Sequence, residues 1–171
     1  MKKHRLPILF FSIALCLAFF CLSFRMVRVS DDTMAPSFRY GQRVLVKTWG
    51  APKRGDVVLF DTKGIRHPQI PNAGVRLIFM KRVIGLPGDR VIINKDQILV
   101  NDSEPAGHPS SNTTATTPNS RAMYRDIQDL PHRDITVPEG QCYVVGDNLE
   151  TSLDSRVFGV VPLDNIRGVI R

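Results

Sequence analysis

Two residues of this chain have side chains that can act together in peptide hydrolysis. Thr33 carries a hydroxyl, and Lys81 lies within an apolar stretch at 77–84 that reads LIFMKRVI. A hydroxyl attacks a carbonyl carbon when a base removes its proton and nearby donors stabilise the oxyanion that forms. A lysine amine can be that base when burial lowers its pKa, by up to about 3–5 units, so that it is neutral near neutral pH. The apolar neighbours of Lys81 favour such a shift.

The surroundings of Lys81 allow two interpretations. Successive side chains of a strand point to opposite faces of a sheet, so Lys81 and Arg82 are expected on opposite sides. One of them can then face a buried site while the other reaches solvent. On the alternative interpretation, both are ordinary surface residues at the end of a strand. The segment that follows, 85–89 (GLPGD), favours the first interpretation because of the family resemblance in which it takes part.

Three segments of the chain together resemble the type I signal peptidases, which are membrane-bound proteases with a serine nucleophile and a lysine general base. These segments are 32–36 (DTMAP), 81–89 (KRVIGLPGD) and 146–156 (GDNLETSLDSR), and they follow a long apolar run in that order. The similarity extends, with gaps, from about 29 to 171 and is weakest at about 102–134. The resemblance implies the fold and the activity of that family.

The resemblance also implies roles for individual residues. It puts Thr33 at the nucleophile position and makes Lys81 the general base. Ser152 is expected to form a hydrogen bond with the lysine. Asp154 and Arg156 are expected to form a supporting ion pair, or alternatively to stabilise only a polar turn. No cofactor and no metal are expected. The other positions implied near the site are Asp147 and Asn148 as supporting residues, and Asp31, Met34 and Pro36 in the substrate and oxyanion region.

The nucleophile segment departs from the family pattern, which has serine where this chain has Thr33. The extra methyl group of threonine restricts χ1 and crowds the line of attack. A misplacement of about 1 Å can lower the rate about a hundredfold. Asp31 stands where some family members have a serine that assists the oxyanion, and an ionised carboxylate only accepts hydrogen bonds. The backbone N–H of Thr33 is then the remaining expected donor, and Ser37 is an alternative nucleophile that would require a local shift of the chain.

The N-terminal segment contains an uncharged run at 6–24 that reads LPILFFSIALCLAFFCLSF. As a helix it would be roughly 28 Å long, close to the roughly 30 Å hydrocarbon core of a bilayer. We interpret it as a retained single-pass anchor; the alternative is a cleaved leader, but the bulky residues at its exit do not resemble a cleavage site. Three basic residues precede the run and two follow it, which favours an N-terminus in the cytoplasm. The resemblance implies the bacterial cytoplasmic (inner) membrane, with the catalytic domain on the outer, periplasmic side.

The rest of the chain is expected to form one mainly β domain. We divide the 171 residues into an N-terminal tail and anchor at 1–28 and a β-rich peptidase domain at 29–171, with a polar loop insertion at about 102–119. Short antiparallel strands without helical periodicity predict a β-sandwich or partly closed barrel. The expected strands share β-branched, apolar residues between turn residues and cover 43–47, 56–60, 75–84, 90–94, 97–101, 141–145 and 165–170.

Three classes of function remain open at this stage. The first is a membrane-bound endopeptidase that removes signal peptides from exported preproteins after small residues, or matures pilin precursors, with threonine in place of serine. The second is a catalytically degenerate homologue that binds signal peptides or a partner protein. The third is a basic module that binds nucleic acid or a membrane surface, because the net charge is +7. Its basic residues are scattered, with no zinc-ligand or aromatic RNA-binding motif, so we expect no nucleic-acid partner and favour a nearby lipid bilayer.

Overall fold

The structure is a computed structural model that describes residues 22–66, 70, 77–93, 98–103, 105 and 133–170, together with residues 10, 12 and 14. The anchor expected at 6–24 lies mostly outside these residues. No helix within the described part of the chain is long and apolar enough to cross a membrane. The expected loop insertion at 102–119 also lies mostly outside the described residues.

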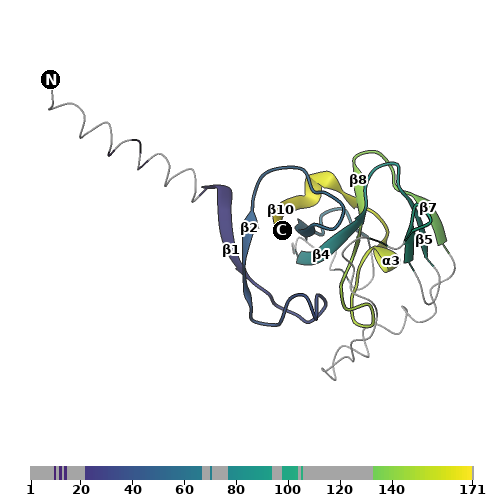
Figure 1. The fold of residues 1–171 in the computed structure, drawn as a ribbon, viewed down its shortest axis with the longest axis horizontal. Helices are drawn as coiled ribbons and strands as arrows, with labels where there is room; N and C mark the ends of the chain where they lie inside the picture. Colours follow the sequence, from purple (N-terminus) through teal and green to yellow (C-terminus); the bar gives the residue numbers. More distant parts are fainter. Residues whose placement is uncertain are drawn as a thin grey trace.

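The described residues form two antiparallel sheets (Figure 1). The larger sheet has seven strands in the order β1-β2-β10-β3-β4-β8-β9, and the smaller has three in the order β6-β5-β7. The prediction of a mainly β, antiparallel domain is therefore confirmed, whereas its finer description as a sandwich or partly closed barrel stays a prediction. The strands are β1 (Phe24–Arg28), β2 (Arg43–Lys47), β3 (Val57–Asp61), β4 (Ile78–Gly85), β5 (Arg90–Ile93), β6 (Ile98–Val100), β7 (Arg133–Thr136), β8 (Gln141–Val145), β9 (Val161–Pro162) and β10 (Ile166–Ile170).

Strand β4, which carries Lys81, lies inside the larger sheet between two other strands. It pairs with β3 on one side, where Lys81 lies opposite Val58, and with β8 on the other, where Arg82 lies opposite Val145. Figure 1 shows β1 and β2 at one side of the molecule and β5 and β7 at the opposite side, with β4 and β8 between them. Side chains of β4 and β8 contribute to two hydrophobic clusters, so the position of Lys81 is set by packing on both sides.

Three strands and two short helices were not among the expected elements. Strand β1 continues directly from the apolar run, β7 lies in a stretch whose sequence shows no clear periodicity, and β9 has only two residues. The domain also contains a one-turn helix, α3 (Ser155–Phe158), and a short 3-10 helix, η2 (Leu163–Asn165), although no helix was expected there. A helix of one turn is too short to show a period of 3.6 residues.

Candidate active site

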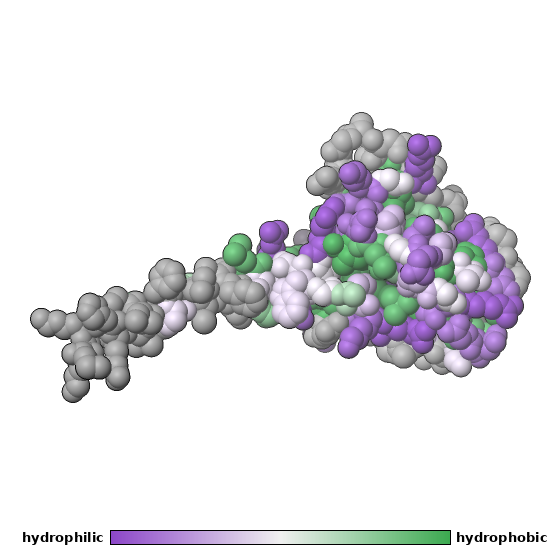
Figure 2. Space-filling view, turned by 90° about the horizontal axis from the view of Figure 1, so that it is seen from above, coloured by the Kyte–Doolittle hydropathy of each residue, from purple (hydrophilic) through white to green (hydrophobic). Residues whose placement is uncertain are grey.

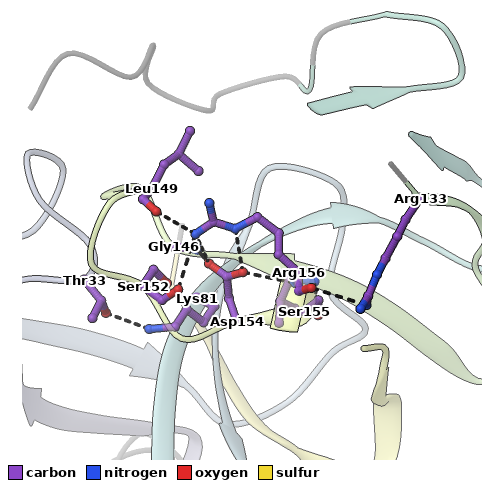
Figure 3. A network of polar contacts seen from close by, with 10 residues as sticks. Thr33, Lys81, Arg133, Gly146, Leu149, Ser152, Asp154, Ser155 and Arg156 are labelled. Atoms are coloured by element: carbon purple, nitrogen blue, oxygen red, sulfur yellow. Dashed lines mark hydrogen bonds and ion pairs between the residues drawn. The ribbon is translucent and has the colours of Figure 1, made fainter. Parts of the chain in front are cut away.

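The side chains of Thr33 and Lys81, which lie 48 residues apart in the sequence, meet in the interior of the domain. The Lys81 Nζ donates a hydrogen bond to the Thr33 Oγ1 over 2.6 Å (Figure 3). Thr33 lies in the turn region between β1 and β2, and Lys81 lies in β4. Both are buried, with 7% and 2% of their surfaces exposed. The structure therefore brings together the two residues that the sequence analysis chose for nucleophile and base.

Burial lowers the pKa of Lys81 from its usual value of 10.5 because the charged amine loses its hydration. The negative charges of Asp31, Asp154 and Asp147 oppose this shift, and the positive charge of Arg156 adds to it. Burial is the largest of these effects and sets the direction. A lysine in this environment holds its proton less tightly than a surface lysine, which is what a general base requires.

If Thr33 and Lys81 act in peptide hydrolysis, the lowered pKa of Lys81 leads to an expected pH dependence of the rate of peptide cleavage. Because only the neutral amine can accept a proton, kcat/KM is expected to rise with pH through the pKa of Lys81 and to fall as the amine becomes protonated at lower pH. The midpoint is expected below 10.5, since the pKa is lowered. A pH series of initial rates measures it. A rate that is flat, or that increases as the pH falls, would contradict the role of Lys81.

The third sequence segment holds the loop that carries Thr33. The backbone N–H of Asn148 donates to the Thr33 carbonyl oxygen over 3.0 Å, and the Asn148 side-chain amide donates to the Asp32 carbonyl oxygen over 3.2 Å. On the other side, Met34 is fully buried in a hydrophobic cluster with residues of β2 and β3. Pro36 is exposed. Anchoring on both sides of Thr33 restricts the direction in which its hydroxyl can point.

Asp31 lies directly against Thr33. Its Oδ1 accepts one hydrogen bond from the Thr33 hydroxyl over 2.6 Å and a second from the Thr33 backbone N–H over 3.0 Å. The backbone N–H that is expected from the sequence to be the remaining donor for an oxyanion is engaged by the carboxylate in the structure. The alternative nucleophile Ser37 is exposed, and its hydroxyl accepts a long contact of 3.5 Å from Arg82 rather than contacting Lys81.

The expected ion pair between Asp154 and Arg156 is present and buried. The guanidinium donates to both carboxylate oxygens over 2.9 Å, in a bidentate arrangement. Burial alone would raise the pKa of Asp154, but Arg156 and the backbone N–H of Gly146 favour the charged form and hold this pKa below its usual value. Asp154 also caps the N-terminus of α3 by accepting the Arg156 backbone N–H. The ion pair thus fixes the conformation of the third segment at the start of α3.

The expected hydrogen bond between Ser152 and Lys81 is absent from the described contacts, although Figure 3 draws both residues in the same network. The Ser152 hydroxyl is fully buried and has no hydrogen-bond partner among the described residues. It lies near enough to Asp154 to help lower the pKa of that carboxyl, without the geometry of a hydrogen bond. Ser152 is therefore a buried hydroxyl near Asp154.

Arg82 takes a position that strand alternation alone did not predict. Instead of reaching free solvent, its guanidinium donates to both carboxylate oxygens of Asp147, over 2.7 and 2.5 Å, and to the Gly55 carbonyl oxygen over 2.7 Å. The Asp147 side chain is completely buried. This pair connects β4 to the third segment next to Thr33 and Lys81. The sequence carries only part of the signal for this pair, because a cation within an apolar strand favours a carboxylate partner without indicating which carboxylate it is.

Gly146 is expected to be intolerant of a side chain. A Cβ at this position would lie 2.1 Å from the Ser152 hydroxyl oxygen and 2.6 Å from the Thr33 carbonyl oxygen. Gly146→Ala is therefore expected to displace the loop that carries Thr33, to destabilise the fold by about 1–3 kcal/mol, and to abolish most of the cleavage at temperatures where the protein is still folded. Thermal unfolding and initial rates of the same preparation measure both effects.

The matched control for this substitution is Gly168→Ala in β10. The three nearest atoms that a Cβ there would meet belong to Val46, at 2.3 Å, and to the Lys47 backbone, so the same kind of overlap arises against residues other than Thr33 and Ser152. We expect Gly168→Ala to lower the unfolding temperature while the folded fraction keeps its activity. Equal loss of activity in both variants at matched folded fractions would show that Gly146 acts on stability alone.

Comparison with known proteins agrees with the resemblance seen in the three segments. The family described as "Signal peptidase, peptidase S26" matches residues 3–171. The "Probable signal peptidase I-1" of Synechocystis is 32% identical over 97% of this chain and 79% of its own length. The "Signal peptidase I V" of Bacillus subtilis is 34% identical over 84% of this chain and 81% of its own length.

A solved structure, that of a signal peptidase I from Enterococcus faecalis, is also similar. It is 24% identical, covers 71% of this chain and 98% of its own, and superposes with a TM-score of 0.43. A likeness at this level carries no conclusion about individual residues. The family match and the two sequence relatives are the stronger findings.

Proposed function

Because this chain belongs to the signal peptidase family, peptidase S26, we propose that it is a membrane-bound endopeptidase in which Thr33 is the nucleophile and Lys81 the general base. Its substrates are exported preproteins, from which it removes the signal peptide. The observation that carries this proposal is the 2.6 Å contact between the Thr33 hydroxyl oxygen and the amine of Lys81. Both groups are buried, and burial lowers the pKa of the amine.

The reaction proceeds in two stages on these residues. Lys81 Nζ takes the proton of the Thr33 hydroxyl as Oγ1 attacks the carbonyl carbon of the scissile bond. The C–N bond then breaks, the lysine returns the proton to the leaving amine, and the peptide remains attached to Oγ1 as an ester. In the second stage Lys81 activates a water molecule, which hydrolyses the ester and restores the Thr33 hydroxyl. The backbone N–H of Thr33 is the donor proposed for the oxyanion in each stage.

The cleaved segment is expected to bind in an extended conformation and to carry small residues before the cut. An extended peptide adds to a sheet through backbone hydrogen bonds, and pockets for alternate side chains then select residue size. The same chemistry suits the maturation of pilin precursors, so the general secretory and the pilin-processing substrates are both included in the proposal. Comparison of one preprotein and one pilin precursor as substrates distinguishes them by their kcat/KM values.

An exposed apolar surface next to β1 fits a location at the membrane. Met26 of β1 and Leu45 of β2 are paired neighbours, with 64% and 48% of their surfaces exposed, and Trp49 is 52% exposed. The Lys47 amine lies 3.3 Å above the Trp49 ring. In Figure 2, hydrophobic surface lies among hydrophilic residues on the face of the domain turned to the viewer. Apolar and aromatic residues with adjacent cations suit the boundary between an anionic bilayer and water.

We further propose that the apolar run at 6–24 is a single-pass anchor in the bacterial cytoplasmic membrane, with the β domain on the periplasmic side. This topology brings Thr33 to the side on which exported preproteins emerge. Resistance of the full chain to extraction by alkaline carbonate, together with access of protease to the domain from the periplasm only, is the expected result. Release into the soluble fraction contradicts the anchor.

The experiment that tests the proposed activity uses the full chain in detergent and a purified preprotein. Wild type is expected to cut slowly and Thr33→Ala not at all. A wild type that cuts nothing, while Thr33→Ser does, would instead identify a degenerate homologue with an intact groove. This second candidate has one observation in its favour, since Asp31 engages both the hydroxyl and the N–H of Thr33. Cleavage that survives Thr33→Ala would indicate a different nucleophile.

A further inference from the structure

Asp31 occupies the two groups of Thr33 that the proposed reaction uses. Its Oδ1 accepts the hydroxyl hydrogen over 2.6 Å and the backbone N–H over 3.0 Å. The hydroxyl must give its proton to Lys81 during attack, and the N–H is a donor suited to the oxyanion. Both groups are bound to the same carboxylate oxygen of Asp31. In this arrangement neither group is free for the reaction, so the structure represents a resting state.

The number of available protons decides the direction of the hydrogen bonds. An ionised carboxylate only accepts, so the one hydroxyl proton of Thr33 is donated to Asp31. Lys81 must then donate to the Thr33 oxygen, as the 2.6 Å contact records. For general-base catalysis the proton has to point toward the lysine amine instead. The hydroxyl can turn only when it leaves Asp31.

We propose that Asp31 is a carboxylate cap on Thr33, which the bound peptide displaces before Lys81 can take the hydroxyl proton. This inference rests on the proposed function. Asp31 is exposed at the surface, so its carboxylate can turn away from Thr33 into water without opening the core. When it does, the N–H of Thr33 becomes free for the oxyanion and the hydroxyl becomes free for the lysine.

The negative charge of Asp31 opposes the action of Lys81 as a base, and so do the hydrogen bonds of Asp31 to Thr33. Burial lowers the pKa of Lys81, while Asp31 raises it, together with Asp154 and Asp147, and Arg156 lowers it. Of the three carboxylates, Asp154 and Asp147 are bound by the arginines Arg156 and Arg82. Asp31 is thus the carboxylate whose removal leaves both buried ion pairs intact and favours the neutral amine at lower pH.

The test compares wild type with Asp31→Ala and Asp31→Asn in the full chain in detergent. Asp31→Ala is expected to raise kcat about tenfold with little change in KM, because a freed oxyanion donor acts mainly in the transition state and alanine adds no hydroxyl of its own. Both variants are expected to move the low-pH limb of the kcat/KM profile to lower pH. The matched control is Asp32→Ala. It removes the same charge at the next residue, whose side chain makes neither contact with Thr33, and it is expected to leave both quantities unchanged.

Binding of two peptides separates this role from a purely structural one. A peptide aldehyde ending in alanine forms a tetrahedral adduct with an oxyanion, whereas the matching carboxamide does not. Asp31→Ala is expected to tighten the aldehyde about tenfold and to leave the carboxamide unchanged. An unchanged or lower kcat in Asp31→Ala, or equal tightening of both peptides, would overturn the cap.

A readout without turnover distinguishes failure of the cap from failure of the proposed function. Hydrogen exchange of the Thr33 amide is expected to be slower in wild type than in Asp31→Ala, since the carboxylate holds that N–H. If neither wild type nor any variant cleaves peptide while this protection is present, the proposed peptidase activity is wrong, although the contact between Asp31 and the Thr33 N–H is present. Equal exchange in wild type and Asp31→Ala would overturn the cap even in an active enzyme.

Discussion

Replacing Lys81 by methionine is expected to reduce the rate of preprotein cleavage by about 10²–10⁴-fold, the range typical for loss of a general base. Methionine keeps an unbranched side chain of similar length in the apolar surroundings of β4, so the change removes the amine with little loss of packing. The amine is the group that contacts the Thr33 hydroxyl, and without it no other base among the described residues contacts that hydroxyl except Asp31. Initial rates at a fixed pH measure the effect.

The stability of the Lys81→Met variant provides its control. Burial disfavours the charged amine, so its removal is expected to leave the unfolding temperature unchanged or raised. The double variant with Thr33→Ala is expected to be no slower than either single variant, because nucleophile and base act as one unit. A Lys81→Met protein that keeps more than about a tenth of the wild-type rate would require a different base.

Thr33→Ser is expected to increase the rate, by between about ten- and a hundredfold. Thr33 is buried, with Met34 fixed in the hydrophobic cluster on one side and Asn148 bound to its carbonyl oxygen on the other. The loop therefore has little freedom to move the methyl group aside. Serine keeps the hydroxyl, removes the methyl and allows a wider choice of χ1. The increase is expected in kcat, and single-turnover cleavage separates it from product release.

The matched control for Thr33→Ser is Thr151→Ser. Thr151 is a buried threonine in the third segment, with 5% of its surface exposed, so the substitution deletes the same methyl group outside the reacting pair. It is expected to leave kcat unchanged. If Thr33→Ser is no faster than wild type, the methyl group does not limit the reaction, and the departure from the family pattern has no kinetic meaning.

The pairing of Thr33 with Lys81 could be anticipated only through the family resemblance. The two residues lie 48 positions apart, and their contact depends on the register that places Lys81 opposite Val58. Periodicity predicted several strands, among them β3 and β8, because runs of β-branched residues between turn residues are a local signal. Register between strands distant in sequence is not a local property, so the geometry of the site did not follow from the strands alone.

The elements and contacts that the sequence did not predict all depend on partner residues or on the detailed conformation of a turn, and not on a periodic local pattern. Strands β1 and β9 are defined by their partners β2 and β8 rather than by their own composition, and α3 is stabilised by the Asp154 cap. Likewise, alternation put Arg82 on the face opposite Lys81 but could not indicate that its partner is Asp147, 65 residues away. The hydrogen bonds of Asp31 belong to the same group, because they depend on the conformation of one turn.

The central claim, that the Thr33 hydroxyl attacks the substrate with Lys81 as its base, is tested most directly by locating the acyl group during turnover. The full chain in detergent is mixed with a peptide ester ending in alanine, quenched in acid, and digested for mass spectrometry. We expect one acyl group on the fragment that contains Thr33, assigned to its hydroxyl by fragmentation and absent from Lys81→Met. An acyl group on Ser37 or elsewhere, or cleavage of the ester by Thr33→Ala at the wild-type rate, would contradict the account.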